Sequence, residues 1–194
     1  THLNEVRQMD IEQAFATDAD VMRTLEEFLL SCVETVRKSC GTELEKLGHK
    51  LDPVKLPLKR VLYKEAIELL RRHGEKIEMG TDFSKTQEKK LTELVGERAY
   101  FITDWPIELK AFYAMPDKNG KTCRAFDLIY DGLEIASGTQ RIQQPDLLIR
   151  QLKMKGLNPD SFKFYVDAFR YGAPHHSGWS IGLERLTMKI TGRE

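Results

Sequence analysis

Two tight-turn signals near the middle of this 194-residue chain constrain its fold most strongly. Asn119-Gly120 and Asp131-Gly132 are dipeptides that favour two-residue β-hairpins, because their residues tolerate positive φ angles. The first turn is expected to join strands at Leu109–Met115 and Cys123–Tyr130, and the second leads into a strand at Leu133–Ser137. Successive hairpins imply an antiparallel sheet.

Sequences with helical periodicity lie on both sides of these strands. Thr17 and Asp20 have the spacing of a capping box, and the apolar residues that follow them predict a helix from Asp18 to Ser39. Further helices are expected at Tyr63–His73, Ser84–Val95 and Pro145–Lys155, and from Asn158 and Gly182. Further strands are expected at His2–Phe15 with one buried face, at Tyr100–Thr103 and near Trp179. The predicted fold class is α+β, an antiparallel β-sheet flanked by helices.

The composition is typical of one globular domain from inside the cell. Hydrophobic residues make up 41% of the chain, and 30 basic residues balance 30 acidic ones, which argues against a domain dedicated to coating nucleic acid. Cys32, Cys40 and Cys123 are odd in number and lack C-x-x-C spacing, so neither a disulfide framework nor a zinc site is expected. No apolar run approaches the length of a membrane helix. We therefore predict a cytoplasmic protein that does not bind a membrane.

The segment 126–141 contains side chains suited to binding a metal ion and a carboxylate. Asp127 and Glu134 would lie on neighbouring strands of a hairpin, where two carboxylates can bind Mg²⁺ and a polyphosphate. Ser137 and Gln140 follow, and Arg141 has the planar group that grips a carboxylate with two hydrogen bonds. The plainer interpretation is a solvated face, since acids and an arginine around a hairpin are usually exposed to water.

A second segment, 169–185, runs from a strand into a helix. Glu184 and Arg185 fall in the first turn of that helix, where a glutamate suits the helix dipole and an arginine does not. Arg185 is therefore expected to have an anionic partner, either a phosphate or a nearby acidic side chain. His175 and His176 are adjacent and would point to opposite sides of a strand, which makes them a poor pair of metal ligands.

Together these segments resemble the aspartyl-tRNA synthetases, a class II family, and particularly its archaeal and eukaryotic branch. FDLIYDGLEIASGTQR (126–141) is similar to that family's sequence around its aspartate and Mg²⁺ site. FRYGAPHHSGWSIGLER (169–185) resembles motif 3 of the class II synthetases, and HLNEVRQMDIE (2–12) resembles the end of the motif 2 loop and its second strand. The resemblance covers almost the whole chain and implies the class II type of antiparallel sheet flanked by helices.

Matched residue by residue, the resemblance implies a site for Mg²⁺, ATP and L-aspartate. The implied metal ligands are Asp127, Glu134 and Ser137. Aspartate would contact Ser137, Gln140 and Arg141, with Arg141 on the side-chain carboxylate. The residues implied to contact ATP are His2, Leu3, Glu134, Gly182, Leu183, Glu184 and Arg185. Glu134 and Arg185 are the implied catalytic residues, because they would stabilise charge on the reacting phosphates.

The implied enzyme is an ATP-dependent aspartate–tRNA ligase. The amino-acid carboxylate attacks the α-phosphate of ATP, pyrophosphate leaves, and the aspartyl group of the adenylate then passes to the 3′ end of tRNA. The implied partners are ATP, L-aspartate, the acceptor end of tRNA and a second copy in a homodimer. Residues 1–194 would be a catalytic domain that is incomplete at both ends, without motif 1, the first half of motif 2 and the N-terminal OB-fold.

Three alternatives remain open at the level of sequence. The first is an asparaginyl or a non-discriminating Asp/Asn synthetase, although the run Ser137–Arg141 looks more like the aspartate branch. The second is a synthetase-like asparagine synthetase. The third is a non-catalytic synthetase-like module that acts by binding, which the absent motifs would favour.

Overall fold

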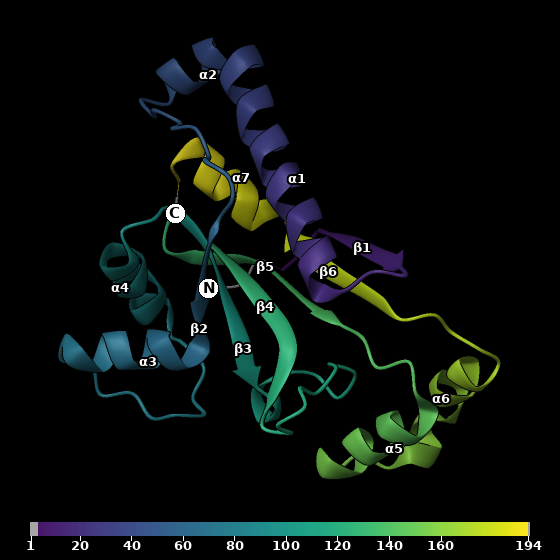
Figure 1. Cartoon of the computed structure of the whole chain (residues 1–194). Helices are drawn as coiled ribbons and strands as arrows, with labels where there is room; N and C mark the ends of the chain where they lie inside the picture. The colour runs from purple at the N-terminus through teal and green to yellow at the C-terminus, as the bar shows by residue number, and fades with distance from the viewer. Residues whose placement is uncertain (1–3, 194) are drawn as a thin grey trace.

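The structure is a computed structural model that describes residues 4–193, and its centre is a sheet of six strands within that range (Figure 1). The strands are β1 (Gln8–Ala14), β2 (Lys59–Leu62), β3 (Ala99–Pro106), β4 (Thr122–Tyr130), β5 (Leu133–Gln140) and β6 (His176–Gly182). Their order across the sheet is β1-β6-β5-β4-β3-β2. All neighbours are antiparallel except β2 and β3, which are parallel. The expected α+β class is confirmed.

The helices begin and end close to the positions expected from the sequence, except for one short helix at Gly41–Lys46 that was not predicted. They are α1 (Asp18–Ser39), α2 (Gly41–Lys46), α3 (Tyr63–Arg72), α4 (Lys85–Val95), α5 (Pro145–Met154), α6 (Lys163–Arg170) and α7 (Leu183–Thr191). Two 3₁₀ helices, η1 (Ile107–Leu109) and η2 (Pro159–Phe162), accompany them. The capping box at the start of α1 is confirmed, since the Thr17 backbone N–H donates to Asp20 Oδ2 at 2.9 Å.

The two faces of the sheet carry different helices. Helices α1 and α7 pack on one face, where Leu25, Phe126 and Ile181 belong to one buried cluster. Helices α3 and α4 pack on the other face against β2, β3 and part of β4, where Ile67, Tyr100 and Ile129 belong to a second cluster. Side chains alternate between the two faces along each strand, so Asp127, two residues before Ile129, points to the α3/α4 face.

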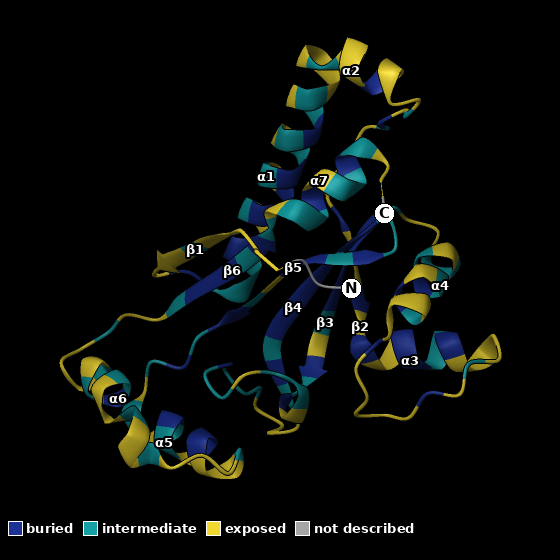
Figure 2. Ribbon diagram, turned by 180° about the vertical axis from the view of Figure 1, so that it is seen from behind, coloured by how far each residue is buried: buried dark blue, intermediate teal, exposed yellow. Residues whose placement is uncertain are grey.

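Two expectations from the sequence are wrong, and one strand was not predicted. The segment 109–115 is not a strand, because β3 continues to Pro106 and pairs directly with Thr122, which leaves 107–121 as an irregular connection. The strand β2 was not expected; its parallel pairing with β3 requires the crossover that contains α3 and α4. The strand β1 has no buried face, since it lies at the sheet edge and only Ile11 is half-buried (Figure 2).

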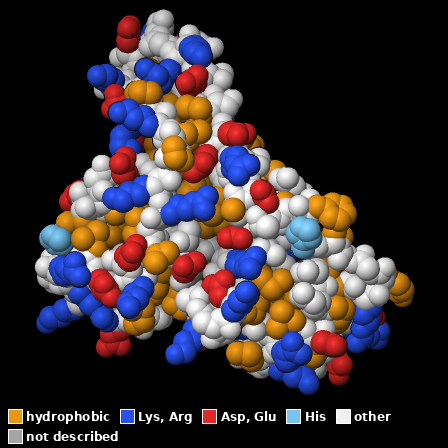
Figure 3. Space-filling view, in the orientation of Figure 1, with side chains coloured by type: hydrophobic (Ala, Val, Ile, Leu, Met, Phe, Trp, Pro, Cys, Tyr) orange, Lys and Arg blue, Asp and Glu red, His pale blue; other side chains and the backbone are white. Residues whose placement is uncertain are grey.

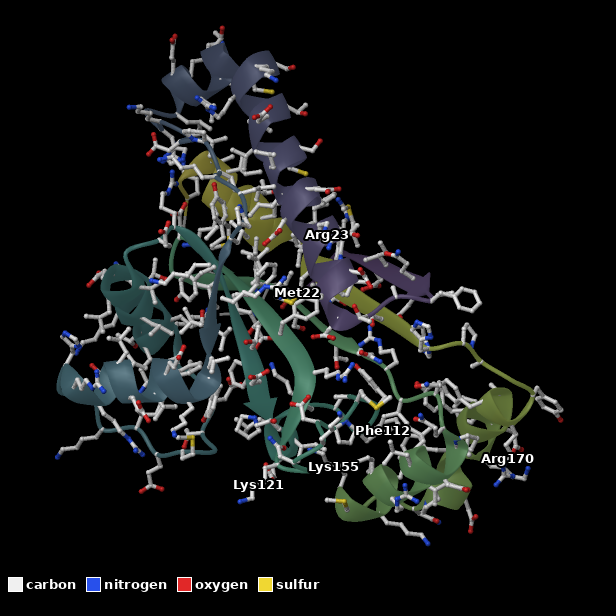
Figure 4. The ribbon with its side chains drawn as sticks, in the orientation of Figure 1. Met22, Arg23, Phe112, Lys121, Lys155 and Arg170 are labelled. Carbon is white, nitrogen blue, oxygen red and sulfur yellow. The ribbon has the colours of Figure 1, made fainter. Side chains whose placement is uncertain are left out.

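Helices α5 and α6 form a small lobe beside the sheet, at the lower right of Figure 1. Phe112, from the connection before β4, reaches this lobe and packs edge-on against Phe162 at 5.2 Å between ring centroids (Figure 4). Lys155, at the end of α5, donates to the backbone oxygens of Ile107 and Glu108 at 2.7 and 2.8 Å. These contacts attach the lobe to the segment that precedes β4.

The surface in Figure 3 carries interspersed Lys or Arg and Asp or Glu side chains, in keeping with the balanced composition. Within residues 4–193, no helix has the length and apolar content needed to cross a bilayer.

Candidate active site

A row of polar side chains crosses four strands on the α3/α4 face of the sheet. In the strand register Asp127 lies opposite Ser137, Ser137 opposite Ser180, and Ser180 opposite Asp10. Directly opposed residues of antiparallel strands project from the same face, with Cβ atoms about 4.5–5.5 Å apart. The sheet therefore presents two hydroxyls side by side, with a carboxylate beyond each of them.

Two adjoining pockets open over this row. The larger, of about 480 Å³, is lined by Val6, Gln8, Glu134, Ile135, Ala136, Ser137, Ser180, Gly182, Glu184, Arg185 and Met188. The smaller, of about 150 Å³, is lined by Lys110, Ala111, Tyr113, Ala114, Ala125, Asp127, Ser137, Gly138, Thr139, Arg141 and Ser180. Ser137 and Ser180 line both pockets, so the two serines mark the junction between them.

Asp127 is a buried carboxylate at the floor of the smaller pocket. Its Oδ2 lies 2.5 Å from Lys110 Nζ, and the Lys110 ammonium also lies 3.9 Å from the centre of the Trp105 ring. Burial raises the pKa of Asp127, and the charge of Lys110 opposes that rise. Its Oδ1 is buried and has no hydrogen-bond partner within residues 4–193. An acceptor is therefore free at the floor of the pocket, where a cation or a donor would satisfy it.

Glu134 lies at the start of β5, beside a bulge in the pairing with β4. Its backbone N–H donates to Glu88 of α4 at 3.0 Å, and its backbone oxygen accepts from Arg185 Nη1 at 2.6 Å. Arg185 Nη1 is 4.0 Å from Glu134 Oε1, so a nearby acid does accompany this arginine. Burial, followed by the negative charge of Asp127, raises the pKa of Glu134 to about 7.

Arg141 enters the smaller pocket directly after β5. Its guanidinium forms an ion pair with Glu12 of β1 and lies 5.1 Å from the centre of the Tyr113 ring. Gln140 is buried, and its side-chain oxygen accepts from Arg124 at 2.8 Å. The pocket thus brings together two cations, on Lys110 and Arg141, and each is matched by a protein carboxylate.

Gly138 allows a close approach between strands beside the site. A Cβ at this position would lie 2.3 Å from Phe126 Cζ and 2.7 Å from the backbone oxygen of Gly178. Both distances are shorter than a Cβ can tolerate, so only glycine fits between β4 and β6 here.

The structure distributes the residues expected from the sequence over three places. Asp127, Ser137 and Arg141 line the smaller pocket, and Glu134, Gly182, Glu184 and Arg185 line the larger one. Leu183 lines neither of these pockets and instead lines an apolar groove formed with α1 and α2. His2 and Leu3 lie outside the described residues.

Four residues that the sequence did not single out also belong to this region: Lys110, Glu12, Ser180 and Glu88. Lys110 lies in the segment 109–115, which the sequence predicts as a strand and the structure does not. Glu12 pairs with Arg141 from 129 residues away in sequence. Ser180 lies two residues before the Gly-Leu-Glu-Arg run at 182–185. Only the strand register identifies it, because that register places it opposite Ser137.

A magnesium ion fits these donors only together with a phosphate. Within the described part of the chain, no three His, Cys, Asp or Glu side chains converge as ligands of one ion. Magnesium is commonly held by one or two carboxylates together with substrate phosphates and water. The free Oδ1 of Asp127 and the carboxylate of Glu134 are suitable donors of that kind.

The whole chain, residues 1–194, matches the family described as tRNA synthetases class II (D, K and N). The chain belongs to this family. Solved structures of the same fold include an aspartyl-tRNA synthetase from Entamoeba histolytica, with a TM-score of 0.91 and 34% identity over 98% of this chain and 41% of that one. An asparaginyl-tRNA synthetase from Pyrococcus horikoshii complexed with asparaginyl-adenylate has a TM-score of 0.91 and 30% identity over 98% of this chain and 45% of its own.

Curated relatives with similar sequences include aspartate–tRNA ligases. The Aspartate--tRNA(Asp/Asn) ligase of Methanopyrus kandleri is 46% identical over 194 residues, which are 100% of this chain and 44% of the relative. The Aspartate--tRNA(Asp) ligase of Picrophilus torridus is 45% identical over 194 residues, or 98% of this chain and 45% of the relative. The chain therefore spans less than half the length of these relatives.

Proposed function

We propose that the protein is an aspartate–tRNA ligase, and that this chain supplies its site for L-aspartate and for part of ATP. The observation that carries the proposal is the pair of adjoining pockets, one small with two cations and one large with Arg185, that meet at Ser137 and Ser180. Two substrates held in these pockets would meet at that junction. Adenylate formation requires such a meeting between a carboxylate and a phosphate.

The smaller pocket supports aspartate as the amino acid. Lys110 and Arg141 both line it, and an arginine can bind a carboxylate with two parallel hydrogen bonds. Asparagine carries a neutral amide in place of the side-chain carboxylate, so it could not form a charge-assisted, two-pronged pair with Arg141. In this proposal Glu12 orients Arg141 from one side. Gln140, whose side chain is held by Arg124, lines neither pocket, and the proposal assigns it no contact with the amino acid.

The larger pocket supports ATP. Arg185 would face the phosphates and Glu184 and Gly182 would border the nucleotide, while Leu183 would contribute backbone only. Asp127, Glu134 and Ser137 would hold Mg²⁺, which supplies positive charge to the phosphates when it is bound. Lys110 and Arg185 add positive charge on either side of the junction. An oxygen of the amino-acid carboxylate then forms a bond to the α-phosphorus as pyrophosphate leaves.

The remaining parts of the proposal concern the whole protein. Transfer of the aspartyl group to the 3′ end of tRNA is supported by the names of the relatives, one of which specifies tRNA(Asp/Asn) and another tRNA(Asp). We include a homodimer and a cytoplasmic location in the same proposal. The chain itself would be a catalytic domain whose missing portions, motif 1 among them, lie elsewhere in the protein.

Binding of stable adenylate analogues tests the amino-acid assignment. Sulfamoyl analogues of aspartyl- and asparaginyl-adenylate would be titrated calorimetrically into the full-length protein, with Arg141→Ala as the matched variant. We expect tight binding of the aspartyl analogue, weaker binding of the asparaginyl analogue, and loss of this preference in Arg141→Ala. Preference for the asparaginyl analogue would refute the assignment of aspartate, and no binding of either would refute the proposed activation site.

A further inference from the structure

Ser180 carries a buried hydroxyl that the fold leaves unused. Its Oγ is buried and has no hydrogen-bond partner within residues 4–193. Most buried polar atoms in native proteins are paired, and an unpaired one lowers the stability of the fold. A bound ligand that forms a hydrogen bond with this hydroxyl would remove that cost.

The neighbours of Ser180 show where that ligand would lie. Ser180 lines both pockets, and in the sheet it is flanked by Ser137 on β5 and Asp10 on β1. It also precedes Gly182, the N-cap of α7, by two residues, and Arg185 of that helix lines the larger pocket. The hydroxyl therefore lies at the junction of the two pockets, on the side nearer to Arg185, where the phosphates of ATP would lie.

We propose that Ser180 is a substrate-contacting residue whose hydroxyl donates a hydrogen bond to an oxygen of the α-phosphoryl group. The inference rests on the proposed function and deepens it by assigning a protein donor to the reacting phosphorus. Ser137, on the other side of the junction, is exposed and open to the metal and the amino acid. With Ser137 assigned to the metal and the amino acid, Ser180 is the other hydroxyl at the junction that can donate to the phosphate.

Ser177 offers a matched control on the same strand. It lies three residues before Ser180 and so points to the opposite face, where its buried Oγ donates to the backbone oxygen of Ala16 at 2.9 Å. It lines neither pocket. Ser177→Ala and Ser180→Ala each remove one buried hydroxyl from β6, but only the second removes one that faces the junction.

The test compares both variants of the full-length protein with the wild type in two measurements. The first is the affinity for the sulfamoyl analogue of aspartyl-adenylate, and the second is the melting temperature without ligand. We expect Ser180→Ala to bind the analogue about 10- to 100-fold more weakly, which is the usual effect of removing a hydrogen bond to a charged group. Its melting temperature should be unchanged or higher, since no hydrogen bond is lost from the free protein.

Ser177→Ala should show the reverse pattern, with a lower melting temperature and an unchanged affinity. Pyrophosphate exchange adds a third measurement: we expect Ser180→Ala to lower kcat while KM for aspartate changes little, because the contact is with phosphate. Unchanged affinity and kcat in Ser180→Ala, with the wild type binding normally, would overturn the assignment of Ser180 alone. Failure of the wild type to bind the analogue would instead overturn the proposed function.

Discussion

Replacing Lys110 by methionine should affect both stability and recognition, and a second substitution can separate the two. Lys110 Nζ lies 2.5 Å from Asp127 Oδ2, and the side chains are 20% and 4% exposed. Methionine keeps the length and apolar character of the lysine stem but removes its charge, so Asp127 is left buried without a cation. Breaking a buried pair in this way costs about 3–5 kcal/mol, which corresponds to a fall of about 6–20 °C in melting temperature for a folded unit of this size.

The loss of stability should also depend on pH. Burial already raises the pKa of Asp127, and removal of Lys110 removes the charge that opposes this rise. Between the unfolded pKa, near 3.8, and the higher folded pKa, the unfolded chain releases a proton that the folded chain keeps. The stability of Lys110→Met should therefore fall as pH rises through that window.

The double variant Lys110→Met/Asp127→Asn should recover most of the stability, because it no longer buries an unpaired acid. It should not recover aspartate binding, because the cation that would face the substrate is still absent. Chemical denaturation monitored by circular dichroism measures the first quantity, and calorimetry with the aspartyl-adenylate analogue measures the second. Wild-type affinity in the double variant would refute a role for Lys110 in recognition, and wild-type stability of Lys110→Met would refute the buried pair.

Three further predictions concern Arg141, Glu134 and Gly138. Arg141→Ala should weaken aspartate binding by about 2–5 kcal/mol in calorimetry, whereas Arg170→Ala, which removes a half-exposed surface arginine, should leave it unchanged. Mg²⁺ binding should strengthen as pH rises through about 7, the raised pKa of Glu134, since only the ionised carboxylate binds metal; a profile that is equally steep in Glu134→Gln would contradict this. Gly138→Ala should destabilise the protein by about 1–3 kcal/mol in urea unfolding through overpacking against Phe126, while Gly41→Ala, where a Cβ meets nothing within 4 Å, should not.

Local sequence signals predicted the elements whose boundaries depend on local chemistry. The capping box at Thr17, Asp131-Gly132 before β5 and Asn158 before η2 all lie where the corresponding elements begin. Asp127 and Glu134 could be placed near each other from the hairpin alone, because two strands joined by a tight turn have a nearly fixed register. The position of Ser137 opposite Asp127 could not, because it depends on the bulge between Leu128 and Ile129, which shifts the register by one residue.

What the sequence could not predict depends on long-range pairing. The edge position of β1 and the parallel pairing of β2 with β3 follow from the order of strands in the sheet, which local periodicity does not encode. The same holds for the Glu12–Arg141 pair and for the pairing of Ser180 with Ser137. Lys110 was misplaced for a different reason: the mostly apolar run at 109–115 precedes the Asn119-Gly120 turn signal and so resembles a strand, but in the structure Phe112 packs into the α5/α6 lobe instead.

Activation of aspartate in the two adjoining pockets can be measured without tRNA. Isotopic exchange between pyrophosphate and ATP, catalysed by the full-length protein with Mg²⁺ and without tRNA, tests it most directly. We expect exchange that depends on L-aspartate, is far slower with L-asparagine, and is abolished in Arg185→Ala. Exchange that requires asparagine, or proceeds equally well without any amino acid, would contradict the proposed activation of aspartate.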